Sequence, residues 1–175
     1  MNKKTLIHTA FFAEAKPIIE SLKLQCTQRK PCKVYQKDGI VLVVSGMGAK
    51  NTLHVKELFE TYDIKKAVNI GIAGCKDTSM EIGSLVCTTH QRDGMYFESI
   101  SSLDAPCSDK EKLSTVLVDM ESETFLHVSK KFLDKSDIYI FKIVSDHLDT
   151  TIPKKEFVWN IIEKNLKKII KEIYA

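Results

Sequence analysis

The feature that most constrains this chain is a series of short, largely apolar runs that alternate with amphipathic segments. The clearest runs are residues 6–12, 40–44, 67–72 and 138–144, with weaker ones at 34–37 and 84–89. A run of this length without a polar face is typical of a strand that helices cover on both sides. The dipeptide Asp38-Gly39, which separates two of the runs, predicts a hairpin turn.

The segments between the runs have helical periodicity. A helix is expected to open at Glu14, with Pro17 near its first turn, and others are expected over residues 55–62, over residues 122–133 and from Pro153 onward. Residues 90–117 are expected to be mostly loop, with a short strand near 95–100. Strands that alternate with helices predict an α/β three-layer domain, and a length of 175 residues favours one domain over 1–175.

Charge and cysteine usage exclude several classes of protein. The net charge of +3 is too small to indicate a nucleic-acid partner, and Arg29 and Arg92 are the only arginines. No apolar run approaches the ~18 residues of a membrane helix, so no membrane partner is expected. The lysine-rich face of the last helix is expected to face solvent. The five cysteines lack C-x-x-C spacing and favour a cytoplasmic protein. The histidines lack ligand spacing, so no metal is expected.

Polar and glycine-rich residues gather where the predicted strands end. In α/β folds, ligands bind beyond the carboxyl ends of the strands, so these residues are expected to meet at one edge of the sheet. They are Glu14, Gly46-Met47-Gly48, Gly71-Ile72-Ala73-Gly74, Met120-Glu121 and Ser145-Asp146.

Each of these features also has a purely structural explanation. Loss of solvation at the end of an apolar strand makes Asp146 a candidate general acid, but Asp and Ser also cap turns. Glu14 and Glu121 are equally compatible with acids in the first turn of a helix. Gly46 and Gly48 begin like a dinucleotide-binding motif, but Asn51 occupies the position of the third glycine. The grouping of the three acids is what predicts a site.

Six motifs in this order resemble the purine nucleoside phosphorylase/uridine phosphorylase superfamily. They are Ala10-Phe-Phe-Ala-Glu14-Ala, Val44-Ser-Gly-Met-Gly48, Asn69-Ile-Gly-Ile-Ala-Gly74, Ile82-Gly-Ser-Leu-Val86, Val118-Asp-Met-Glu-Ser122 and Ile143-Val-Ser-Asp146. The closer resemblance is to the hydrolytic branch, the methylthioadenosine/adenosylhomocysteine nucleosidases and futalosine hydrolases. It implies an α/β three-layer sandwich with a central mixed β-sheet and cleavage of the N-glycosidic bond of a purine-type nucleoside.

The resemblance also implies roles for single residues. Asp146 would protonate the departing base and Glu14 would activate water. Glu121 would bind the ribose hydroxyls, with Met120 packed on the sugar. The remaining substrate-binding residues would be Met47, Gly71, Ile72, Ala73, Gly74 and Ser145. The resemblance implies no cofactor, a small-molecule nucleoside as the partner, a role in purine salvage, and a homodimer whose subunits complete each other's pockets.

Hydrolysis is favoured over phosphorolysis. Family phosphorylases hold phosphate with arginines, whereas both arginines here lie outside the motifs and Lys142 stands where relatives often carry arginine. An anionic Glu14 would also repel phosphate. The alternatives are a phosphorolytic nucleoside phosphorylase, a non-catalytic nucleoside-binding protein on the same scaffold, and a Rossmann-type protein with affinity for NAD or NADP.

Two departures from the family leave the nucleoside undefined. The segment from His90 to Val118 is shorter than in the nucleosidases and lacks a match to the loop that clamps the purine, so Tyr96 or Phe97 is a candidate to stack on the base. Ile72 stands where many nucleosidases have serine, and there the futalosine hydrolases are more similar.

Overall fold

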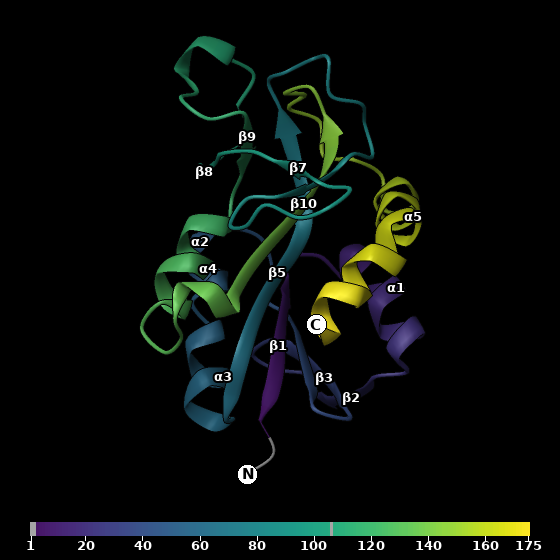
Figure 1. Ribbon diagram of the computed structural model, residues 1–175, viewed down its shortest axis with the longest axis vertical. Helices are drawn as coiled ribbons and strands as arrows, with labels where there is room; N and C mark the ends of the chain where they lie inside the picture. The colour runs from purple at the N-terminus through teal and green to yellow at the C-terminus, as the bar shows by residue number, and fades with distance from the viewer. Residues whose placement is uncertain (1–2, 106) are drawn as a thin grey trace.

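The computed structural model describes residues 3–105 and 107–175, and within them ten strands form a sheet with helices on both faces (Figure 1). The strands are β1 (Lys4–Thr9), β2 (Gln25–Gln28), β3 (Lys33–Lys37), β4 (Ile40–Val44), β5 (Ile64–Cys75), β6 (Leu85–Cys87), β7 (Tyr96–Phe97), β8 (Ile100–Ser102), β9 (Leu117–Asp119) and β10 (Ile138–Asp146). The helices are α1 (Phe12–Leu22), α2 (Ala49–Thr52), α3 (Val55–Thr61), α4 (Ser122–Ser129) and α5 (Lys155–Tyr174), with short 3₁₀ turns at Lys110–Lys112 and Lys135–Asp137.

The sheet is mixed, as expected. Its order is β2-β3-β4-β1-β5-β10-β6-β7, and β9 pairs with both β5 and β8. Neighbours within the central group β4-β1-β5-β10 are parallel. The pairs β2-β3, β3-β4 and β10-β6 are antiparallel, and β7 joins β6 in parallel. The parallel strands therefore end at the same edge of the sheet, which is where ligands bind in such folds.

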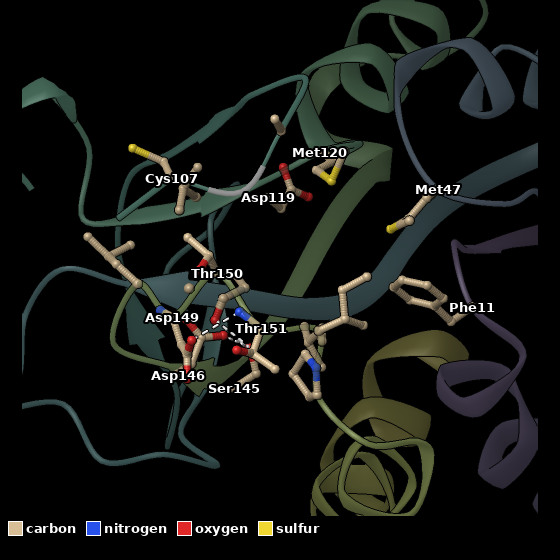
Figure 2. A pocket seen from close by; sticks show the side chains of 18 of the residues that line it. Phe11, Met47, Cys107, Asp119, Met120, Ser145, Asp146, Asp149, Thr150 and Thr151 are labelled. Atoms are coloured by element: carbon tan, nitrogen blue, oxygen red, sulfur yellow. Dashed lines mark hydrogen bonds between the residues drawn. The ribbon is translucent and has the colours of Figure 1, made fainter. Parts of the chain in front are cut away.

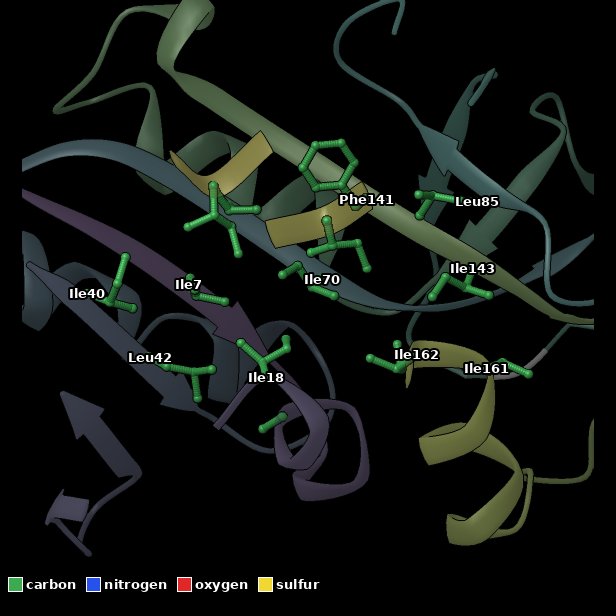
Figure 3. Close-up of a cluster of buried hydrophobic side chains, with 14 of the residues drawn as sticks. Ile7, Ile18, Ile40, Leu42, Ile70, Leu85, Phe141, Ile143, Ile161 and Ile162 are labelled. Carbon is green, nitrogen blue, oxygen red and sulfur yellow. The ribbon is translucent and has the colours of Figure 1, made fainter. Parts of the chain in front are cut away.

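Helices cover the two faces in separate groups. Helices α1 and α5 lie on one face, and α2, α3 and α4 lie on the other (Figure 1). Residues along β4 alternate between the two cores. Ile40 and Leu42 pack with α1 and α5 (Figure 3). Val41 and Val43 pack with α3 and α4. This alternation explains why the strand sequences are apolar throughout, and it gives the predicted three layers.

Several element boundaries differ from the expectations. Helix α1 begins at Phe12, two residues earlier than expected, so Pro17 lies beyond its first turn. Strand β5 runs from Ile64 to Cys75, well past the apolar run at 67–72, because its end continues to pair with β10 and β9. Strands β2 and β9 were not predicted, and β2 is fully exposed, which leaves no apolar pattern in its sequence.

The hairpin at Asp38-Gly39 is confirmed. Asp38 has φ 47° and Gly39 has φ 81°, the left-handed pair that a two-residue turn needs. In the described part of the chain, no helix combines the length and the apolar character that crossing a membrane requires.

Candidate active site

A pocket of about 120 Å³ opens at the carboxyl ends of the central strands (Figure 2). Asp119 and Met120 lie on one side of it, Ser145 and Asp146 lie on the other, and Met47 with Phe11 lies at one end. Of the ten residues predicted for the site, nine line this pocket: Glu14, Met47, Ile72, Ala73, Gly74, Met120, Glu121, Ser145 and Asp146. The sheet topology therefore brings the three predicted acids to one cavity.

Glu14 is held by backbone donors from two segments. Its Oε2 accepts hydrogen bonds from the N–H groups of Ala10 (3.0 Å) and Phe11 (2.9 Å), and its Oε1 accepts one from Ile72 (3.0 Å). The bond from Phe11, the residue before α1, is the return half of a capping box, so the helix-terminus explanation of Glu14 holds as well. Burial raises the pKa of Glu14 to about 7, against the opposing attraction of Lys142.

Glu121 joins two loops of the pocket. Its Oε1 accepts a 2.7 Å hydrogen bond from the backbone N–H of Gly48, which follows β4. Glu121 directly precedes α4, but its side chain makes no capping bond to that helix. Burial raises the pKa of Glu121, and Lys142 opposes the rise. The carboxyl group of Glu121 therefore lines the pocket and does not cap the helix.

Asp146 is less buried than its position after an apolar strand suggested. Its side chain is half-buried. The hydroxyl of Ser145 donates to Oδ2 at 2.6 Å, and the backbone N–H of Asp149 donates to Oδ1 at 2.9 Å. The second bond is the turn cap considered above. Asp146 thus caps a turn and lines the pocket at the same time.

A buried ion pair lies beside these acids, and no role was predicted for it. Lys142 Nζ lies 2.8 Å from Asp119 Oδ2, with 2% and 1% of the two side chains exposed. Burial opposes ionisation of Asp119, but Lys142 and the hydroxyls of Ser102 and Ser122 outweigh it and lower the pKa of Asp119. A lysine inside an apolar strand was the signal in the sequence, since a buried ammonium needs a carboxylate partner.

Gly71 does not line the pocket, contrary to the expectation. It lies behind Glu14, and a Cβ added there would come within 2.8 Å of Glu14 Oε1 and 3.1 Å of Lys142 Nζ. Its lack of a side chain gives those two groups their space. The candidate stacking residues Tyr96 and Phe97 form the exposed strand β7 and are not part of the pocket lining. The prediction that one of them covers the base has no support in their position.

The lining is strongly acidic. Within the described residues it contains five carboxyl side chains and no Lys, Arg or His; the acids are Glu14, Asp119, Glu121, Asp146 and Asp149. Arg92 lies elsewhere, paired with Glu172 and Tyr139. A cationic group would be stabilised in this pocket, whereas an anion would be repelled.

A second, largely apolar groove of about 480 Å³ adjoins the pocket. The two cavities share Phe11, Ile72, Ile152 and Pro153 as lining residues. The pocket alone is smaller than the roughly 300–1,000 Å³ typical of small-molecule sites. Together with the groove it forms a continuous concave surface beyond the strand ends.

Solved structures with the same fold are enzymes that act on nucleosides. A mutant of the Helicobacter pylori 5′-methylthioadenosine nucleosidase with 5′-methylthioadenosine in its active site matches with a TM-score of 0.81 at 18% identity, over 98% of this chain and 100% of that one. A mutant futalosine hydrolase from the same organism matches with 0.81 at 17% identity, over 98% and 100%. The Campylobacter jejuni 5′-methylthioadenosine/S-adenosylhomocysteine nucleosidase matches with 0.81 at 20% identity, over 97% and 98%.

These likenesses establish the fold of the chain as the nucleoside phosphorylase fold, a mixed sheet with helices around it. No protein-family model matches the sequence. No curated protein matches it.

Proposed function

We propose that this protein hydrolyses the N-glycosidic bond of a purine-type nucleoside. The observation that carries the proposal is the convergence of Glu14, Glu121 and Asp146 on one pocket at the strand ends. The fold is that of solved nucleosidases, which supports the same reaction class. Cleavage of this bond passes through a cationic sugar, and carboxylates around the sugar stabilise that charge.

Each acid has a distinct role in the proposal. Asp146 donates a proton to a nitrogen of the departing base, and the bond from the sugar C1′ to the base breaks. A water molecule forms the new bond to C1′ and gives its proton to Glu14, whose pKa of about 7 suits a general base near neutral pH. Glu121 accepts hydrogen bonds from the ribose hydroxyls, and Met120 packs on the sugar.

Water is favoured over phosphate as the nucleophile. Phosphate would enter a described lining with no basic side chain and with four carboxyl groups besides Asp119, whose charge Lys142 balances. Lys142 does not offset this charge for a phosphate, because its ammonium is bound to Asp119 and only 2% of its side chain is exposed. A phosphorylase needs cationic donors at the attacking group.

The proposal extends to purine salvage, a homodimer and a cytoplasmic location. Met47 lines the pocket and is 39% exposed, and Phe12 in the adjoining groove is 45% exposed, so a second subunit could cover both. All five cysteines are free thiols, which is compatible with a reducing compartment. Sedimentation of the purified protein at several concentrations tests the dimer.

The decisive experiment is a panel of purine nucleosides incubated with and without inorganic phosphate. Chromatography then measures the free base and distinguishes free sugar from sugar 1-phosphate. We expect base and free sugar at a rate that does not depend on phosphate. Phosphate-dependent turnover would identify a phosphorylase. Calorimetric binding of a nucleoside without any base release would identify a binding protein. Tight binding of NAD or NADP would contradict all of these nucleoside-directed functions and would indicate a Rossmann-type protein.

A further inference from the structure

Lys142 is a fully buried cation at the middle of the sheet. It lies in β10, opposite Gly71 of the parallel strand β5 and Val86 of the antiparallel strand β6. Its ammonium contacts Asp119 at 2.8 Å. An ion pair this deeply buried is weak evidence for stability, because desolvation of both charges offsets their attraction. Its place beside the pocket acids suggests a different purpose.

The ammonium also lies close to Glu14. Glu14 Oε1 and Lys142 Nζ both occupy the space that a Cβ at position 71 would need, at 2.8 Å and 3.1 Å from it. Those two distances limit the separation of the charges to about 6 Å, a range within which opposite charges shift each other's ionisation. The absence of a side chain at Gly71 therefore leaves room for both groups beside each other at the pocket.

The titratable groups that face Lys142 come from three elements and the turn after β9. Glu14 belongs to α1, Asp119 to β9 and Glu121 to the turn that precedes α4, and all three raise the pKa of Lys142 against the effect of burial. His8 of β1 is the fourth titratable neighbour, and burial lowers its pKa to about 3, with a further contribution from Lys142. His8 is therefore neutral, and Lys142 supplies the positive charge of the group.

Asp119 is fully committed to structural contacts. Besides Lys142, it accepts hydrogen bonds from Ser122 N and Oγ and from Ser102 Oγ. Glu14 and Glu121 therefore make no ion-pair contact with Lys142. Both line the pocket, and the positive charge of Lys142 lowers the pKa of each. Asp119 thus anchors the ammonium, and the other two carboxyl groups remain available to a ligand.

We infer that Lys142 is a positioning residue for Glu14: anchored by Asp119, its ammonium favours the ionised form of the Glu14 carboxyl group, the form that takes a proton from water. The inference rests on the proposed hydrolysis, in which Glu14 must be anionic before each turnover. Lys142 touches no substrate in this arrangement and acts through the acid.

The test compares the pH dependence of base release in variants that change the buried pair. Removing Lys142 alone would strand the Asp119 charge, so the variant is the double substitution Lys142→Met with Asp119→Asn. We expect the acidic limb of its profile, with each rate taken relative to the plateau of the same protein, to move up by about one pH unit, so that the relative rate at pH 6 is about tenfold lower than that of the wild type. Lys142→Arg keeps the charge and is expected to keep the limb at the wild-type position.

A matched control is Lys66→Met, which removes another buried lysine. Lys66 lies in β5 and donates to the carbonyls of Glu172 and Ile173 at the end of α5, far along the strand from the pocket. Its loss is expected to leave the limb unchanged. A limb at the same pH in the wild type and the double variant would overturn the inference.

A direct titration keeps this test separate from the proposed function. Carbon-13 NMR of the side-chain carboxyl of Glu14 gives its midpoint without turnover. An upward shift of about one unit in the double variant supports the inference even if no nucleoside is cleaved, in which case the proposed function alone fails. An unchanged midpoint overturns the inference whatever the activity.

Discussion

The backbone N–H of Gly48 donates a 2.7 Å hydrogen bond to Glu121 Oε1, which ties the turn after β4 to the turn after β9. Two segments far apart in the sequence therefore share one carboxyl group. In the proposed function the same carboxyl group accepts hydrogen bonds from the ribose hydroxyls.

Substitutions at Glu121 are expected to separate these two tasks. Glu121→Gln keeps an acceptor for Gly48 but loses the charge, so kcat/KM should fall about ten- to hundredfold, the effect of losing a charged hydrogen bond of about 1.5–3 kcal/mol. Glu121→Ala should lower both kcat/KM and the melting temperature. Steady-state kinetics and thermal unfolding measure the two effects, and equal stability of the Ala and Gln variants would contradict the bridging role.

Asp146→Asn is expected to reduce base release by about 10²–10⁴-fold, the usual contribution of a general acid. Asparagine keeps an acceptor for the N–H of Asp149, so circular dichroism and thermal unfolding should stay close to wild type. Asp134→Asn, at an exposed position before a short turn, serves as the control. Equal turnover of Asp146→Asn and the wild type would remove Asp146 from the chemistry.

The pKa of Glu14 predicts how turnover depends on pH. A general base must be ionised, so kcat/KM should rise with pH through about 7. Glu14→Gln should reduce turnover by about 10²–10⁴-fold and abolish this limb. Rates measured from pH 5 to 9 test both expectations. A limb that persists in Glu14→Gln would have to belong to another group.

Much of the fold could be predicted because the sheet is covered on both faces. Strands whose two faces both pack in a core, such as β4, have apolar sequences that stand out from the helices between them. Strand β2 lies exposed at the sheet edge and carries no such pattern. The length of β5 depends on its pairing with β9 and β10, which no local pattern encodes.

The residues of the site also divide into those that the sequence predicts and those that depend on the assembled fold. Glu14 and Asp146 could be placed together because they lie at the ends of parallel strands that meet at one edge. Glu121 follows β9, which is antiparallel to β5, so its place in the pocket depends on the pairing of β9 with the end of β5. Gly71 was expected in the lining, but whether a glycine faces the cavity or a neighbouring side chain depends on the pleat of β5 and on the length of Lys142. The pairing of Lys142 with Asp119 joins β10 to β9 across β5, and such a contact depends on the assembled sheet.

The stability of the protein should also report the ionisation of Glu14. Between pH 4.5 and about 7 the folded protein binds a proton at Glu14 that the unfolded chain has lost, so this group lowers stability as the pH rises. His8 has the opposite sign, because the unfolded chain binds its proton below pH 6.5 and the folded protein does not above about 3.

A comparison of the wild type with Glu14→Gln isolates the contribution of Glu14. The free energy of unfolding of the variant, relative to the wild type, should rise by on the order of 3 kcal/mol between pH 5 and pH 8. Urea unfolding at the two pH values measures it. If the free energy of unfolding of the variant relative to the wild type is the same at pH 5 and pH 8, Glu14 is ionised in the folded protein at both pH values.

Gly71→Ala is expected to destabilise the protein by about 1–3 kcal/mol, the range for inserting a methyl group into a packed interior. The new Cβ would lie 2.8 Å from Glu14 Oε1, so the acid must move and turnover should fall. Adding Glu14→Asp, which shortens the acid, should restore part of the stability but not the turnover. Urea unfolding measures the stability of the single and double variants. Full stability of Gly71→Ala would contradict the close packing around position 71.

Strand β10 carries Lys142, Ser145 and Asp146 and comes late in the chain, whereas Glu14 comes early. A partly folded molecule in which β10 is not paired with β5 lacks both the proposed proton donor, Asp146, and the cation, Lys142, at the pocket. The proposed cleavage therefore requires a sheet in which β10 is paired with β5.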